Sequence, residues 1–155
     1  MRLEGEERIL DTLPKLLRAK ARGAHGSKVA MRVKDRGIWQ SYTWRDYFEK
    51  VGDLCLGMVR LGLQRGEKIC IIGENKPEWF WAELAAQAAG AVAVGVFTDC
   101  VAREVKYFIE HSDSTFVVAH DQEQVDKVLE IKDELPLLRK VIYWDPKGLW
   151  GYRHP

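Results

Sequence analysis

The chain has 155 residues, of which 46% are hydrophobic and 30% are charged, and its formal net charge is +1. This length suits one domain with a single core, and the composition is that of a globular protein rather than a disordered one. The scattered, nearly balanced charge offers no strong field for nucleic acid or for an acidic membrane, and we expect no nucleic-acid partner. Three cysteines cannot all pair, and the start of the chain lacks an apolar targeting segment, so we expect a cytoplasmic location.

Residues 1–42 predict a helix followed by a β-hairpin. Between Ile9 and Arg22 leucines recur at helical spacing, and Pro14 is suited to a first helical turn. KVAMRVK and IWQSYT then alternate apolar and polar residues on either side of a short Asp-Arg-Gly connection. That pattern is typical of a hairpin.

Residues 43–155 predict alternating helices and strands. Thr43, with Asp46 three residues later, is expected to cap a helix whose core face carries six apolar residues: Phe48, Val51, Leu54, Cys55, Met58 and Leu61. After Gly66 we expect strands at Lys68–Gly73, Ala91–Phe97, Thr115–Ala119 and Val141–Trp144. Helices are expected between them at Pro77–Ala89, Val101–His111 and Asp121–Leu135.

The predicted fold class is α/β, a Rossmann-like parallel sheet with flanking helices, preceded by the N-terminal helix and the hairpin. The first two strands are almost continuously apolar, which is typical of strands covered on both faces. The apolar stretch Phe80–Phe97 is long, but Glu83 and Gln87 interrupt it and Gly90 punctuates it. We therefore expect a buried helix and a buried strand there, and no transmembrane segment.

The turn GENKPEW follows the first predicted strand, where nucleotide-binding sheets often hold phosphate. Gly73 is its only glycine, whereas a dinucleotide turn needs three and a P-loop ends in Lys-Ser/Thr. A small dinucleotide-binding domain is therefore disfavoured. Asn75 in this turn is expected to be the N-cap of the helix that follows. Asp99 and Asp121 are expected to have the same role at the ends of two later strands.

No catalytic or metal-binding set is predicted. Cys100 lies near a helix start, where a thiolate can be stabilised, but no partner base is identifiable. The spacing of Cys100, His111 and His120 matches no zinc pattern.

Several phrases taken together resemble the N-terminal part of AMP-forming acyl-CoA synthetases, most of all bacterial long-chain fatty-acid–CoA ligases. They are the capped helix of YTWRDYFEK, the turn GEK, an apolar strand, the N-x-P-E-W turn and an Ala-rich helix that ends in AGAV. The later phrases DQEQVDKVLEI and DPKGLWGY are similar to the long-chain branch. The resemblance covers nearly the whole chain.

Such enzymes activate a fatty acid with MgATP to an acyl-adenylate and then transfer the acyl group to coenzyme A. The resemblance implies that residues 1–155 are the N-terminal α/β portion of the large domain, with 1–42 as helix and hairpin and 43–155 as the βαβ layer. The phosphate-binding loop, the adenine and ribose contacts and a C-terminal lysine belong to later segments of the family. ATP, Mg²⁺ and coenzyme A are thus expected as cofactors of the parent enzyme. We expect this chain alone to bind none of them tightly and to be inactive.

The same resemblance implies that Phe97, Thr98 and Asp99 border a coenzyme A channel. Here the stretch reads VGVFTDCVAREV, whereas relatives often carry a proline and small hydroxyl residues. Lys127 corresponds to a basic residue that some relatives direct towards the phosphate of the coenzyme. The alternative for Lys127 is an ordinary solvated lysine.

If the chain is an incomplete part of a larger domain, its partners are the remaining segments of the same protein. We then expect self-association through the Trp-rich helix Pro77–Ala89 or the strand Val141–Trp144, and peripheral membrane contact of the parent enzyme. The alternative is a freestanding non-catalytic α/β binding or interaction module.

Overall fold

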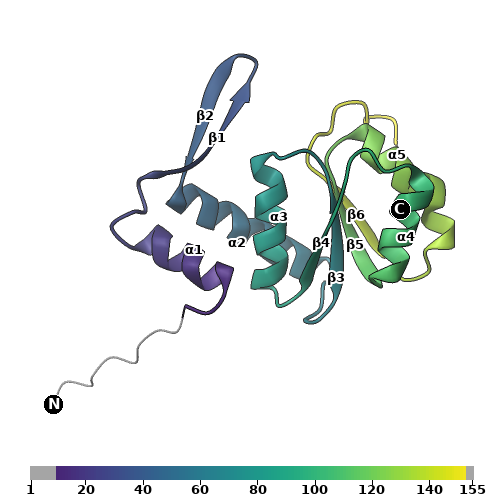
Figure 1. The fold of residues 1–155 in the computed structure, drawn as a ribbon, viewed down its shortest axis with the longest axis horizontal. Coiled ribbons are helices and arrows are strands. Elements are labelled where there is room, and N and C mark those ends of the chain that lie inside the picture. Colours follow the sequence, from purple (N-terminus) through teal and green to yellow (C-terminus); the bar gives the residue numbers. More distant parts are fainter. Residues whose placement is uncertain (1–9, 153–155) are drawn as a thin grey trace.

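Four parallel strands form the centre of the molecule in the computed structural model, which describes residues 10–152 (Figure 1). Their order across the sheet is β4-β3-β5-β6, with bounds β3 (Lys68–Ile72), β4 (Val92–Val96), β5 (Ser114–Ala119) and β6 (Lys140–Tyr143). From β3 the chain crosses to β4 on one side and then to β5 on the other. The Rossmann-like parallel sheet predicted from the sequence is confirmed.

Helices cover both faces of this sheet and extend beyond it. Their bounds are α1 (Leu13–Arg22), α2 (Trp44–Arg60), α3 (Pro77–Ala88), α4 (Ala102–His111) and α5 (Gln122–Ile131), with a 3₁₀ turn η1 (Lys132–Glu134) after α5. A separate two-stranded antiparallel ribbon, β1 (Val29–Asp35) and β2 (Ile38–Thr43), projects away from the sheet (Figure 1).

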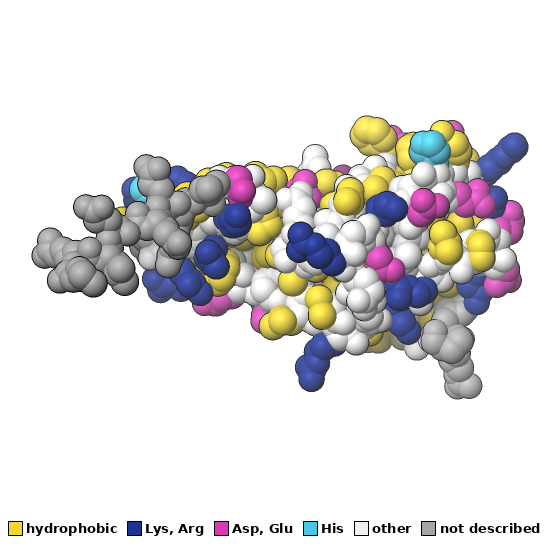
Figure 2. All heavy atoms as spheres, turned by 90° about the horizontal axis from the view of Figure 1, so that it is seen from below, with side chains coloured by type: hydrophobic (Ala, Val, Ile, Leu, Met, Phe, Trp, Pro, Cys, Tyr) yellow, Lys and Arg dark blue, Asp and Glu magenta, His cyan; other side chains and the backbone are white. Residues whose placement is uncertain are grey.

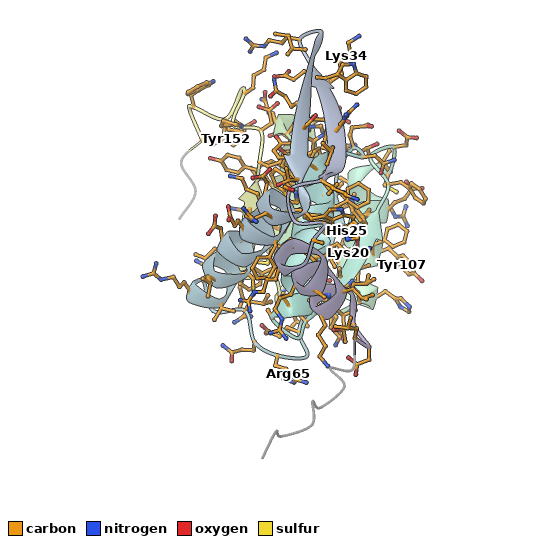
Figure 3. The ribbon with its side chains drawn as sticks, turned by 90° about the vertical axis from the view of Figure 1, so that its left-hand side faces the viewer. Lys20, His25, Lys34, Arg65, Tyr107 and Tyr152 are labelled. Atoms are coloured by element: carbon orange, nitrogen blue, oxygen red, sulfur yellow. The ribbon has the colours of Figure 1, made fainter. Side chains whose placement is uncertain are left out.

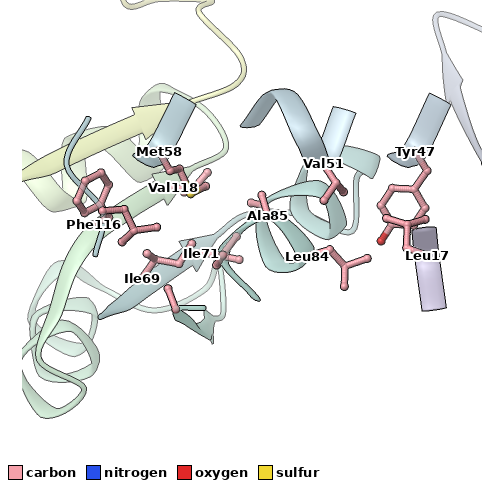
Figure 4. Packing of buried hydrophobic residues seen from close by; sticks show 14 residues of the cluster. Leu17, Tyr47, Val51, Met58, Ile69, Ile71, Leu84, Ala85, Phe116 and Val118 are labelled. Carbon is pink, nitrogen blue, oxygen red and sulfur yellow. The ribbon is translucent and has the colours of Figure 1, made fainter. Parts of the chain in front are cut away.

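Alternation along the central strands divides the core into two parts, because successive side chains of a strand point to opposite faces. Ile69 and Ile71 of β3 pack with Phe116 and Val118 of β5 against α2 and α3. Met58 of α2 belongs to the same buried cluster (Figure 4). The intervening residues of both strands pack against α4 and α5 on the other face: Cys70, Ile72, Val117 and Ala119.

The starts of the helices confirm two of the predicted caps and correct two others. The hydroxyl of Thr43 accepts from the N–H of Asp46, whose carboxylate accepts from the N–H of Thr43, so α2 has its capping box. Asp121 accepts from the N–H of Gln124 at the start of α5. Asn75 is not the N-cap of α3, and Asp99 is not that of α4.

Proline explains the first correction. The residue before a proline is driven to extended backbone, and Lys76 has φ −100° and ψ 159°, so the non-helical cap position is Lys76 rather than Asn75. Before α4 the chain forms a turn over residues 97–100, in which the N–H of Cys100 donates to the carbonyl of Phe97 at 3.3 Å. The helix consequently starts after Val101, whose N–H donates to the Glu104 carboxylate.

Two burial predictions were wrong. Strand β4 was expected to be covered on both faces, but it lies at the edge of the sheet and is largely half-buried or exposed. Leu61 was expected in the core, but it follows the last turn of α2 and is 48% exposed. The prediction that Pro14 lies in the first turn of the N-terminal helix is confirmed, because α1 begins at Leu13, whereas Ile9 lies outside the described residues.

The hairpin reverses through two residues with positive φ, Arg36 at 45° and Gly37 at 84°. Both central residues of a two-residue turn in a twisted ribbon take this conformation, for which glycine is favoured. At its base Tyr42 meets Trp81 of α3 edge to face, with ring centroids 5.2 Å apart. Within residues 10–152 no helix is both long enough and apolar enough to cross a membrane.

Candidate functional site

A pocket of about 370 Å³ lies beyond the carboxyl ends of β3 and β4. Parallel strands bring their carboxyl ends to one edge of a sheet, which is where α/β folds hold ligands. The lining comes from the end of β4, from the two loops that follow β3 and β4, and from the first turn of α3: Gly73, Glu74, Asn75, Trp79, Gly95, Val96, Phe97 and Thr98. We take this pocket as the candidate site.

Trp79 forms one wall of the pocket, against the backbone of Gly95. A Cβ at position 95 would lie 3.2 Å from Cζ2 of Trp79, so a larger residue would displace the indole ring. Trp79 was not among the site residues expected from the sequence, and it also packs against the core on the α2–α3 side of the sheet. The N-x-P-E-W turn was the available signal, because Pro77 sets the first helical turn and thereby brings Trp79 back over the strand ends.

The loop after β4 carries the three residues that the resemblance assigned to a coenzyme A channel. Phe97 is 80% exposed, and Asp99 is exposed as well. The hydroxyl of Thr98 donates to Oε1 of Glu74 at 3.4 Å, which joins the two loops of the pocket. Phe97 and Thr98 line the pocket and Asp99 follows them outside it.

Lys127 reaches this loop from α5, so the structure brings together residues that are 29 positions apart. Its ammonium donates to the carbonyl of Thr98 at 2.7 Å and to Oε1 of Gln124 at 3.3 Å, and it lies 2.8 Å from Oε1 of Glu123. An ammonium has three donors, and these three oxygens match that number. The bond from Lys127 lowers the pKa of the Glu123 carboxyl. Lys127 is not an ordinary solvated lysine, since its side chain is only 18% exposed.

A second crevice is expected between β3 and β5, where the chain changes direction across the sheet. It is filled by side chains. The rings of His120 and Trp144 stack there with centroids 5.0 Å apart and 19° between their planes. A Cβ at Gly73 would overlap Cη2 of Trp144 and lie 2.9 Å from Cβ of His120. These two rings therefore occupy the space beside Gly73 at this point of the sheet.

The cysteines within residues 10–152 form no disulfide. Cys70 is buried, and burial raises the pKa of its thiol although Ser114 and Ser112 hydrogen-bond to it. Cys100 is half-buried and free. In that part of the chain, no group of three His, Cys, Asp or Glu side chains is placed to hold a metal ion.

Comparison with known proteins identifies the family. The family model described as AMP-binding enzyme matches residues 17–151. The chain belongs to the AMP-binding enzyme family. Among curated members, a long-chain-fatty-acid–CoA ligase of Xenopus laevis is 32% identical over 120 residues, which cover 77% of the chain and 16% of that protein. A Drosophila melanogaster protein of the same description is 35% identical over 104 residues, covering 67% and 15%.

Solved structures of AMP-binding enzymes share the fold. An anthranilate CoA ligase in complex with anthranoyl-AMP superposes with a TM-score of 0.77 at 21% identity over 84% of this chain and 24% of its own. The acetoacetyl-CoA synthetase of Streptomyces lividans has a TM-score of 0.74 at 26% identity over 90% and 22%. The chain thus spans about one sixth of the length of the two curated relatives and about a quarter of each solved chain.

Proposed function

We propose that the chain is the N-terminal α/β portion of the large domain of a long-chain fatty-acid–CoA ligase, with residues 1–42 as helix and hairpin and 43–155 as the βαβ layer. The match of the AMP-binding enzyme model to residues 17–151 carries this proposal, and the curated relatives supply the substrate class. The parent enzyme would activate a fatty acid with MgATP to an acyl-adenylate and pass the acyl group to coenzyme A. A carboxylate is a poor acyl donor until adenylation makes its leaving group a good one.

The role of these residues is to build the wall of a substrate channel. Phe97 and Thr98 are suited to coenzyme A because they present an exposed aromatic ring and a hydroxyl at the mouth of a pocket. Lys127 would hold the Thr98 backbone in place, since its ammonium is already committed to protein oxygens. Asp99 is exposed at the same loop and would tune the approach of an anion. ATP and Mg²⁺ would be bound by other segments of the parent enzyme.

The chain by itself would be inactive and would bind none of these cofactors tightly. Incubation with MgATP, palmitate and coenzyme A, followed by chromatographic detection of AMP, tests this directly. We expect no AMP above the level of a heat-denatured sample. Formation of AMP in proportion to the concentration of folded protein would show that the catalytic groups are present in these residues.

The coding sequence around these residues tests the larger proposal. A reading frame that continues into a Ser/Thr/Gly-rich phosphate loop supports the ligase. A native stop codon directly after Pro155 would instead favour a freestanding binding module.

Self-association of the chain would follow from its open edges. Strands β4 and β6 each pair on one side within the described residues, and Tyr143 of β6 and Phe80 of α3 are exposed. We place the contact on β6 or on α3. Sedimentation over a range of concentrations should show a mass that rises with concentration, and a monomer throughout would exclude this contact. The parent enzyme would be cytoplasmic, with peripheral contact to membranes where its substrate partitions.

A further inference from the structure

The outer half of the β1–β2 hairpin exposes two large apolar side chains far from the core. Ile38 and Trp39 are 66% and 63% exposed, and neither belongs to the two hydrophobic clusters of the body. The ribbon carries them away from the sheet and its helices (Figure 1). An exposed tryptophan at the end of a projecting ribbon is available for contact with another surface.

Basic side chains surround this tryptophan. Lys34 is paired with Trp39 across the ribbon, and Arg32 with Ser41, so Arg32, Lys34 and Trp39 share one face. Arg36 follows at the turn. Figure 3 shows Lys34 at the far end of the hairpin, remote from Lys20 and Arg65 of the body.

The basic residues of the hairpin tip, defined as residues 32–39, are exposed and, among the described residues, are not paired with carboxylates. Five body cations, Lys15, Lys68, Lys106, Lys127 and Arg139, have a carboxylate partner, whereas Arg18, Lys20 and Arg22 of α1 are in none of the ion pairs within residues 10–152. None of the ion pairs within residues 10–152 includes Arg32, Lys34 or Arg36, and Asp35 is the one acidic residue of the tip. On the face of the body seen in Figure 2, by contrast, basic and acidic side chains are interspersed.

We propose that the hairpin tip docks on an anionic lipid bilayer, with Trp39 in the interfacial layer and Arg32, Lys34 and Arg36 over the headgroups. Ile38, next to Trp39 in β2, lies on the other face of the ribbon. Tryptophan favours the interfacial layer, and each basic residue near an anionic surface strengthens binding about fivefold. Neither signal suffices alone, whereas the two together support reversible attachment. A bilayer fits better than an acidic protein because the tip is the free end of a projecting ribbon (Figure 1), and none of its residues lines the pocket described above. The inference rests on the proposed function, since it names the surface by which a long-chain ligase would reach its substrate.

Co-sedimentation of the 155-residue chain with vesicles tests the proposal. Phosphatidylcholine vesicles containing phosphatidylserine should bind the chain, and pure phosphatidylcholine vesicles should bind it far less. The triple variant R32Q/K34Q/R36Q should lower the partition coefficient roughly 100-fold, as three fivefold effects multiply. Trp39→Ser should lower it on both vesicle types. Circular dichroism should report the same helix content for all variants, because the tip contributes nothing to the core clusters.

A matched control removes the same charge from the body through K132Q/K140Q/K147Q and should bind as the original chain does. A second control, Trp150→Ser, removes an indole that is exposed elsewhere. The proposal would be overturned if the tip triple variant and the body triple variant lost vesicle binding equally. Equal binding of the original chain to both vesicle types, or no binding to either, would also overturn it. The proposal would also be overturned if the chain bound polyglutamate more strongly than vesicles and lost that binding in the tip variants. That result would indicate that the tip binds an acidic protein. The assay uses no fatty acid, ATP or coenzyme A, so its failure leaves the ligase proposal standing, and failure of the ligase proposal leaves vesicle binding unchanged.

Discussion

The backbone at Gly73 lies against the ring of Trp144, so one added methyl group tests how tightly this end of the sheet is packed. A Cβ there would overlap Cη2 of Trp144 and lie 2.9 Å from Cβ of His120. Overpacking of this kind costs about 1–3 kcal/mol. Alanine also restricts the unfolded chain, which offsets about 0.4–1 kcal/mol. We therefore expect Gly73→Ala to lower the free energy of unfolding by roughly 1–2 kcal/mol.

Urea unfolding followed by far-ultraviolet circular dichroism measures this change. A thermal scan should show a midpoint lower by about 2–4 °C for each kcal/mol lost. Gly57→Ala is the matched control, because a Cβ at that position in α2 meets no heavy atom within 4 Å. It should raise the free energy of unfolding by about 0.5–1 kcal/mol, since glycine is unfavourable inside a helix.

The variant Trp144→Leu decides whether the ring is the cause. In that background the cost of Gly73→Ala should fall by about 1 kcal/mol, within the coupling expected of residues in contact, and the His120 contact should leave a remainder. An equal cost in both backgrounds would refute the claim that the Trp144 ring fills the crevice between β3 and β5. A stabilising Gly73→Ala would refute it as well.

Three further predictions concern the core, a helix cap and a link between loops. Met58→Ala should cost about 2–5 kcal/mol in urea unfolding because Met58 is fully buried, and a change under about 1 kcal/mol would contradict its place in the core. Hydrogen bonds from the hydroxyl and the N–H of Thr43 lower the pKa of Asp46 in the folded chain. The ionised Asp46 carboxylate therefore stabilises the fold above the pKa of the unfolded chain, about 4, and this stabilisation is lost as the pH falls through the lower pKa of the folded chain. The difference in urea midpoint between the original chain and Asp46→Asn should therefore become smaller as the pH is lowered. A difference that becomes larger in acid would contradict the lowered pKa of Asp46. Nη2 of Arg139 lies 2.6 Å and 2.5 Å from the two carboxylate oxygens of Glu67, so Arg139→Lys should lower the free energy of unfolding by on the order of 1 kcal/mol. Strict additivity with Glu67→Gln would show that the pair is uncoupled.

Much of the fold could be predicted because each element carries its own local signal. Thr43 and Asp46 hydrogen-bond to each other's backbone N–H groups within one helical turn, so the start of α2 depends on neighbouring residues alone. The apolar side chains of KICII favour a buried strand, whatever its position in the sheet. The N-cap of α3 was also predictable in principle, since Pro77 restricts the residue before it, but the stronger capping preference of Asn75 concealed this. In such a conflict the steric restriction prevails over the hydrogen-bonding preference.

The candidate site was predictable only in part. Phe97 and Thr98 follow a strand, so their position at the sheet edge could be read from the pattern. The partners of Lys127 could not, because the carbonyl of Thr98 comes within reach only after α5 has packed on the sheet. The wall formed by Trp79 depends likewise on the angle at which α3 leaves β3, and no spacing in the sequence encodes that angle.

What the sequence by itself determined is the order of helices and strands, the parallel sheet and the family to which the chain is similar. Those properties depend on residues close together in the chain, or on phrases that can be matched one after another. Only the tertiary structure decided that β4 is an edge strand, that His120 and Trp144 fill the crevice between β3 and β5, and that Lys127 binds the Thr98 loop. Each of these depends on which elements become neighbours in space, and that choice is made by the packing of the whole core.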